Sequence, residues 1–160
     1  GIAGAFLGAK IAGARLLDYE SAIVPCIPLG HAFGRIGCFM AGCCYGIPYD
    51  GPFSVRYPNS AAGLSPEVSV FPVQLLEALI NTAVFFFLIF YARKPRKSLD
   101  LIVLYLLIYG TERFFLEYLR GDMVRGRFAQ LSTSQWISAG IVLLCGIYLG
   151  VFRKNAAKSV

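Results

Sequence analysis

Charged side chains are scarce in this chain of 160 residues, of which Asp, Glu, Lys and Arg make up 15%. Water-soluble domains carry about 25% charged residues. Apolar residues reach 57%, and the mean hydropathy is positive. The shortage of charge therefore argues against a soluble domain and predicts an integral membrane protein. The net charge of +6 does not predict nucleic-acid binding, because the basic residues fall at the ends of apolar segments rather than on one solvated face.

A C-x-x-C spacing is missing among the five cysteines, although Cys43 and Cys44 are adjacent. This spacing does not favour a zinc or thioredoxin-type site, so we expect small, packed, apolar cysteines and neither a metal nor a cofactor. The chain also begins at Gly1 without a Met or a charged leader. We therefore expect no signal peptide, and we expect the natural protein to start further upstream.

Long apolar stretches dominate the sequence, and a membrane crossing needs about 20 such residues. The pattern predicts an all-α fold, a polytopic transmembrane helix bundle formed by residues 1–160 as one domain. The second stretch contains Pro25 and Pro28, so we expect an irregular helix that is covered by protein rather than by lipid. About five spans are expected, over residues 1–17, 22–43, 72–92, 99–119 and 134–152.

The basic loops predict an orientation. Short loops rich in Lys and Arg stay in the cytoplasm, and two such segments occur at residues 93–97 and at the C-terminus, 153–158. The loops 44–70 and 120–133 then face outward. The second of them is itself basic, which an anionic ligand on the outer side would explain.

Arginines at membrane depth are the main candidates for a functional site. Arg35 lies in a glycine-rich apolar stretch, where a charge costs several kcal/mol unless it meets a partner or water. Tyr109, Arg113, Glu117 and Arg120 follow one another at intervals of four, four and three residues, which places them on one face of a helix. Convergent guanidinium groups suit a phosphate, so the pattern predicts a site for a phospholipid headgroup.

The alternative is a chain of ion pairs through Glu117 that neutralises itself against a neighbouring helix. We favour the headgroup because the arginines outnumber Glu117, with Glu112 or Glu77 as further counter-charges.

Three more polar residues fall near these segments. His31, the only histidine, precedes Arg35 by four residues, and its neutral form could accept a proton or simply pack and donate a hydrogen bond. Gln74 and Glu77 begin the third span. They could orient an arginine or merely end a helix in water.

Four segments in chain order together resemble the prolipoprotein diacylglyceryl transferase family. They are Gly34–Phe39, Pro72–Glu77, Tyr109–Arg120 and Ser132–Ser138. The resemblance implies a bacterial plasma-membrane enzyme of lipoprotein maturation, of which this chain would be the C-terminal five of seven spans. Such enzymes transfer the diacylglyceryl group of phosphatidylglycerol to the lipobox cysteine of a prolipoprotein signal peptide and release glycerol phosphate.

The resemblance also implies roles for residues. Arg35 and Arg113 would hold the phosphate, with Arg120 and Glu117 ordering them and Tyr109 bonding the headgroup. The reaction needs a base for the incoming thiol, for which His31 is the candidate. The remaining substrate-binding candidates are Gln74, Glu77, Gly34 and Gly37.

The chain departs from the family pattern at two cysteines. Cys38 stands where the family usually has asparagine, and Cys43 where it has glutamate. Two alternatives therefore stay open. One is a non-catalytic membrane protein that retains an anionic-phospholipid site, and the other is a transferase or redox protein that uses Cys38, Cys43 and Cys44.

Overall fold

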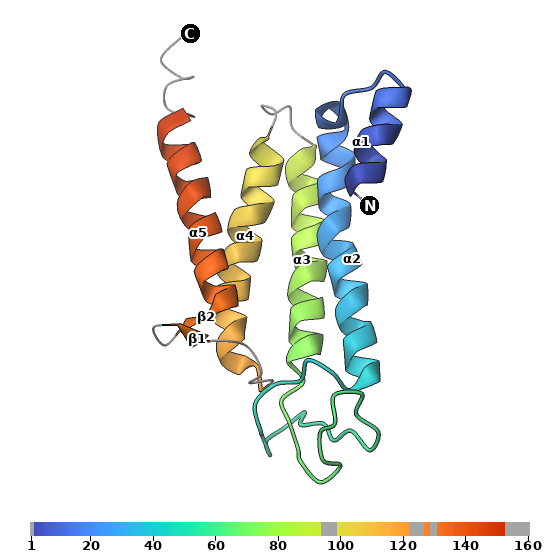
Figure 1. Ribbon diagram of the computed structural model, residues 1–160, viewed down its shortest axis with the longest axis vertical. Helices are drawn as coiled ribbons and strands as arrows, with labels where there is room; N and C mark the ends of the chain where they lie inside the picture. Colours follow the sequence, from blue (N-terminus) through green and yellow to red (C-terminus); the bar gives the residue numbers. More distant parts are fainter. Residues whose placement is uncertain (1, 94–98, 122–126, 129–130, 153–160) are drawn as a thin grey trace.

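A computed structural model describes residues 2–93, 99–121, 127–128 and 131–152. Within these ranges the long helices run side by side in an elongated bundle (Figure 1), which confirms the predicted all-α membrane fold. A short α1 (Ile2–Ile11) and the 3₁₀ helix η1 (Leu16–Tyr19) come first. The long helices are α2 (Glu20–Ala41), α3 (Val73–Ala92), α4 (Asp100–Leu116) and α5 (Thr133–Ile147).

Three helical stretches in the described part of the chain are long and apolar enough to cross a membrane: 20–41, 73–92 and 133–150. The last of them includes part of the π-helical turn η3 (Tyr148–Phe152). The 17 residues of α4 span about 25 Å, and the 3₁₀ turn η2 (Glu117–Leu119) extends them. Large apolar side chains such as Phe115, Leu143 and Leu144 are exposed on the outside of the bundle, as lipid contact requires.

The predicted first span, 1–17, is wrong as a single helix. The helix α1 ends at Ile11, and Gly13 has a φ of 64°, a left-handed conformation that a continuing helix excludes. The chain then turns before η1. The prediction for the second stretch is also wrong, because α2 runs unbroken through Pro25 and Pro28 and most of its side chains are exposed, among them Phe33 and Met40. The two prolines are themselves buried, so protein covers α2 only on the face that carries them.

The apolar core lies between α2, α3 and α4. It is a cluster of buried side chains made of Val24, Val84, Leu88, Leu101 and Tyr105. At this end of the bundle, the buried carboxylate of Glu20 accepts hydrogen bonds from the first backbone N–H groups of α4, including that of Leu99 at 2.8 Å. A carboxylate is well placed there because these N–H groups have no partner within the helix.

The connections after α2 and after α4 meet at the opposite end of the bundle (Figure 1). An isolated bridge pairs Gly46 with Arg120, and two more pair Pro48 and Val55 with Val70. A two-stranded hairpin, β1 (Arg127–Phe128) with β2 (Leu131–Ser132), precedes α5. The sequence did not predict these strands, but it did place both connections at one end.

Candidate functional site

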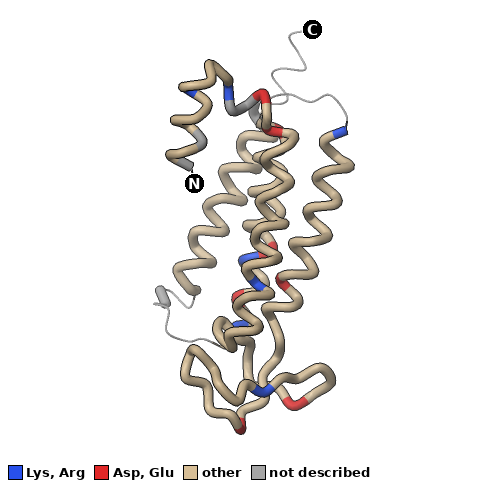
Figure 2. Tube along the Cα trace, turned by 90° about the vertical axis from the view of Figure 1, so that its right-hand side faces the viewer, with Lys and Arg blue, Asp and Glu red and all other residues tan. Residues whose placement is uncertain are grey.

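The centre of the candidate site is a carboxylate that joins two arginines from different helices. Glu77 on α3 is buried, with 3% of its surface exposed. Its Oε2 is ion-paired with Nε of Arg35 on α2, and its Oε1 lies 3.3 Å from Nη1 of Arg113 on α4. The predicted convergence of Arg35 and Arg113 is therefore present. Of the two alternatives for Glu77, the structure shows the one in which it orients arginines. Figure 2 shows charged positions of both signs close together within the bundle, on helices that are otherwise mostly uncharged.

A small cavity of about 30 Å³ lies at this junction. That volume holds about two water molecules. A phosphate group needs more room, so headgroup binding requires an outward movement of a lining side chain. Among the ion-paired lining groups, Arg35 is the most able to move, because 25% of its side chain is exposed, against 11% for Arg113. The cavity is lined by His31, Arg35, Glu77, Asn81, Tyr109, Glu112, Arg113 and Leu116.

The predicted proton acceptor and the headgroup tyrosine lie together on one side of the cavity. Nδ1 of His31 is 3.2 Å from the hydroxyl of Tyr105. The His31 and Tyr109 rings are 5.4 Å apart, and Tyr109 stacks on Tyr105. His31 is exposed on α2. These contacts orient the imidazole while leaving it accessible to a substrate.

Two further polar residues, Asn81 and Glu112, complete the lining. Nδ2 of Asn81 donates to Oε1 of Glu112 at 3.0 Å and to the Glu77 carbonyl at 2.8 Å. Asn81 is not among the site residues predicted from the sequence. The signal was available, because an amide within an apolar stretch lies four residues after Glu77, on the same helix face.

Charge balance in the cluster differs from the sequence expectation. Arg113 pairs with Glu117 through Nη2 and Oε2 at 3.1 Å, in addition to Glu77. All three glutamates that the sequence offered as counter-charges lie in this region, so three arginines face three carboxylates when all are ionised. The expected excess of positive charge is corrected accordingly, and an anionic ligand must compete with carboxylates for the guanidinium groups. The charged residues of this cluster are Arg35, Arg113, Arg120, Glu77, Glu112 and Glu117.

Gln74 and Arg120 fix the segment that follows α2 rather than lining the cavity. Nε2 of Gln74, which is fully buried, donates to the Cys43 carbonyl at 2.8 Å and to the Tyr57 hydroxyl at 3.3 Å. Arg120 is buried and donates to the Cys44 thiol. Burial raises the pKa of Tyr57, although the hydrogen bond from Gln74 opposes this.

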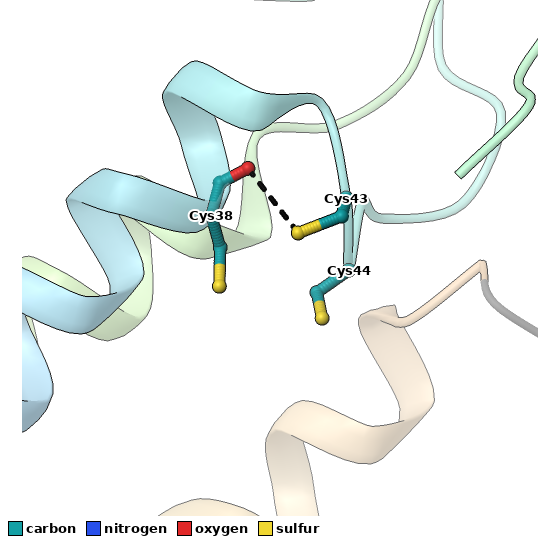
Figure 3. A group of neighbouring side chains, drawn as sticks. All are labelled: Cys38, Cys43 and Cys44. Carbon is teal, nitrogen blue, oxygen red and sulfur yellow. Dashed lines mark hydrogen bonds between the residues drawn. The ribbon is translucent and has the colours of Figure 1, made fainter. Parts of the chain in front are cut away.

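Three thiols meet beside Arg120. The Sγ atoms of Cys38, Cys43 and Cys44 lie within 4.8 Å of one another (Figure 3), a grouping that the sequence analysis did not predict. Burial and the hydrogen bond with Cys38 raise the pKa of Cys43 to about 11. Burial also pushes the pKa of Cys44 upward, but the hydrogen bond and charge of Arg120 outweigh it and the pKa is lowered.

Gly34 and Gly37 lie on an exposed part of α2 and do not line the cavity. A Cβ added at either position would meet nothing within 4 Å. Their role in substrate binding stays a prediction from the resemblance.

Comparison with known proteins identifies one family. A model of the prolipoprotein diacylglyceryl transferase family matches residues 1–151. A phosphatidylglycerol–prolipoprotein diacylglyceryl transferase of Clostridium tetani is 43% identical over 133 residues, which are 83% of this chain and 51% of that protein.

Two further relatives carry the same description. The protein of Clostridium perfringens is 38% identical over 84% of this chain and 51% of its own length. The protein of Methylibium petroleiphilum is 36% identical over 98% of this chain and 60% of its own length. The chain spans about half the length of the curated relatives it matches.

Proposed function

Because this chain belongs to the prolipoprotein diacylglyceryl transferase family, we propose that its protein transfers the diacylglyceryl group of phosphatidylglycerol to the cysteine thiol of a prolipoprotein signal peptide. The observation that carries the proposal is the convergence of Arg35 and Arg113 on Glu77, at the junction of α2, α3 and α4.

The transfer reaction requires positive charge next to the phosphate group that leaves. In the transfer, the thiol sulfur attacks the glyceryl carbon, and the bond from that carbon to the phosphate oxygen breaks. The leaving glycerol phosphate gains negative charge, which guanidinium groups held in advance stabilise. Arg35 is the more exposed of the two arginines and contacts the headgroup first, while Arg113 is held from two sides by Glu77 and Glu117.

His31 takes the proton of the incoming thiol. Its ring lies beside Tyr109 at the cavity and is open to the outside of the bundle. Tyr109 donates a hydrogen bond to the headgroup. The protein works as a multi-pass protein of the bacterial plasma membrane with a cytoplasmic C-terminus, an orientation supported by the basic segments 93–97 and 153–158.

The test is an assay of lipid transfer to a lipobox peptide, with full-length protein in micelles that contain phosphatidylglycerol. Arg35→Ala and Arg113→Ala should each abolish most transfer, while Arg15→Ala, an exposed arginine before η1, should leave it unchanged. Transfer that survives both of the first two substitutions at the wild-type rate would rule out the assigned mechanism.

A second candidate function is a membrane protein that binds an anionic phospholipid without transferring it. Cys43, in place of the glutamate that the resemblance leads one to expect, favours this candidate. Full-length protein that binds phosphatidylglycerol but never modifies a peptide thiol would establish it.

A further inference from the structure

We propose that Cys38, Cys43 and Cys44 bind one Zn²⁺ through three thiolates, with the fourth coordination position left for the thiolate of the acceptor cysteine. The three Sγ atoms already lie within 4.8 Å of one another. With Zn–S bonds of about 2.3 Å, tetrahedral ligands are about 3.8 Å apart. Closing the set around a metal therefore requires sulfur movements of about 1 Å or less, which side-chain rotation supplies.

The backbone around the thiols is built to bring them together. α2 ends at Gly42, whose φ of 64° turns the chain back on the last helical turn. A Cβ at this position would lie 2.9 Å from the Tyr57 ring, so the turn depends on glycine. The N–H of Cys43 then donates to the Cys38 carbonyl at 3.1 Å. The turn thus returns Cys43 to the side of Cys38.

Cys44 is held in an unusual conformation. Its φ is 55°, in the left-handed region that a residue with a side chain rarely occupies. Strain of this kind persists only where the surroundings hold it. Here Gln74 donates to the carbonyl of the preceding Cys43, and the N–H of Gly121 donates to the carbonyl of the following Tyr45. The strained residue directs its thiol into the cluster (Figure 3).

Charge and ligand type both favour this metal. Thiolates are soft ligands that select Zn²⁺ over Mg²⁺ or Ca²⁺, and three protein ligands with one open position are typical of catalytic zinc. Three thiolates around Zn²⁺ carry one net negative charge. Arg120, which is buried and donates to Cys44, compensates for it.

The role of the metal rests on the proposed transferase function. Arg35 precedes Cys38 by three residues and so lies on the same face of α2, next to the thiols. When the acceptor thiol binds Zn²⁺ it gives its proton to His31, as in the proposed transfer, and becomes a thiolate. Its sulfur forms the C–S bond as the C–O bond to the phosphate breaks, and the electron pair leaves with glycerol phosphate. Zinc keeps its oxidation state, and Arg35 meets the leaving phosphate one helical turn away.

Metal content tests the site independently of activity. Full-length protein purified without chelator should contain one zinc per chain, and Co²⁺ exchanged into it should show thiolate charge-transfer and tetrahedral d–d absorption bands. Cys38→Ser, Cys43→Ser and Cys44→Ser should each reduce the zinc content severalfold. Cys26→Ser and Cys145→Ser are the matched controls, because these thiols lie elsewhere on α2 and α5, and they should retain full zinc.

Transfer assays on the same samples separate the two proposals. Zinc-loaded protein that loses transfer on chelation and regains it with added Zn²⁺ supports the metal role. Protein that transfers lipid at full rate without zinc overturns the inference and leaves the proposed function intact. Protein that binds zinc through these thiols but never transfers lipid retains the metal site and overturns the function. A disulfide among the three, seen as a mass two hydrogens lower that reductant restores, with no zinc bound, also overturns the inference.

Discussion

Arg113 of α4 reaches across to Glu77 of α3, with Nη1 3.3 Å from Oε1 of a carboxylate that is almost fully buried. The same carboxylate holds Arg35 of α2. One glutamate thus sets the relative positions of three helices and of two cations. Because breaking a buried charge pair leaves the partner uncompensated, these positions are coupled to folding as well as to ligand binding.

Replacing Glu77 should distinguish its role in positioning the two arginines from any role in binding phosphatidylglycerol. Glu77→Gln keeps the shape but removes the charge that orients both arginines, so we expect kcat for lipid transfer to fall by about 100-fold. The net positive charge left behind should keep KM for phosphatidylglycerol the same or lower. Steady-state kinetics with varied lipid measure both quantities. The control is Glu67→Gln, an exposed loop residue. An unchanged kcat would contradict the role assigned to Glu77.

Arg113 should not tolerate lysine. Its guanidinium contacts Glu77 through one terminal nitrogen and Glu117 through the other, which a single ammonium group cannot reproduce. We expect Arg113→Lys to lose about 100-fold in transfer, close to the loss with Arg113→Ala. Transfer rates of the two variants at saturating lipid make the comparison. A lysine variant with wild-type activity would mean that charge alone is needed at this position.

Contacts within one helix could be predicted from the spacing of residues in the sequence. Contacts between helices could be predicted only in part. The interval of four between Arg113 and Glu117 correctly predicts that they share a face, and the structure pairs them at 3.1 Å. The bridge from Glu77 to both arginines depends on how α2, α3 and α4 pack. Helical periodicity carries no information about which glutamate on another helix faces a given arginine. The charge balance of the cluster was therefore misjudged.

The cysteines show the same limit at shorter range. Cys38 and Cys43 are five residues apart, a separation that places them on different faces of a continuous helix. They meet because α2 ends at Gly42, which adopts a left-handed conformation between them. A glycine there was visible in the sequence. That it would reverse the chain, and that Cys44 would also adopt a positive φ, depends on contacts with Tyr57 and Gln74 from later segments.

Gly46 should be essential for joining the two connections at the site end of the bundle. A Cβ there would overlap the carbonyl oxygens of Phe71 and Leu119, both in backbone that cannot yield easily. We expect Gly46→Ala to lower the melting temperature of the protein in detergent. We also expect it to slow the reaction of Cys44 with a maleimide at neutral pH, because separation from Arg120 removes the hydrogen bond and charge that lower the pKa of this thiol. Thermal unfolding and labelling of Cys44 measure the two effects.

Gly140→Ala on α5 is the matched control for this substitution, because a Cβ at that position meets nothing within 4 Å. It should leave the melting temperature and the labelling unchanged. A Gly46→Ala variant that behaves like Gly140→Ala would show that the contact between the two connections does not depend on close backbone approach.

Glu20 should stabilise the end of the bundle that lies opposite the candidate site. Its Oε2 accepts from the N–H of Leu99 at 2.8 Å, and its Oε1 accepts from Leu101 and Ile102 at 3.0 Å. Glu20→Ala leaves these buried donors without an acceptor and should lower the free energy of unfolding by about 1–3 kcal/mol. Glu20→Gln retains one acceptor oxygen and should lose less. Asp18→Asn, an exposed neighbour in η1, should be neutral.

Chemical unfolding in detergent, followed by helical circular dichroism, measures the differences among these variants. Because Glu20 lies far from Glu77 along the bundle (Figure 1), Glu20→Ala should lower stability while the residual folded protein keeps its transfer rate per molecule. Equal stability of all three variants would show that the first turn of α4 is satisfied without the carboxylate. A loss of transfer in the folded fraction would instead show that the position of α4, and with it that of Arg113, is set from this end.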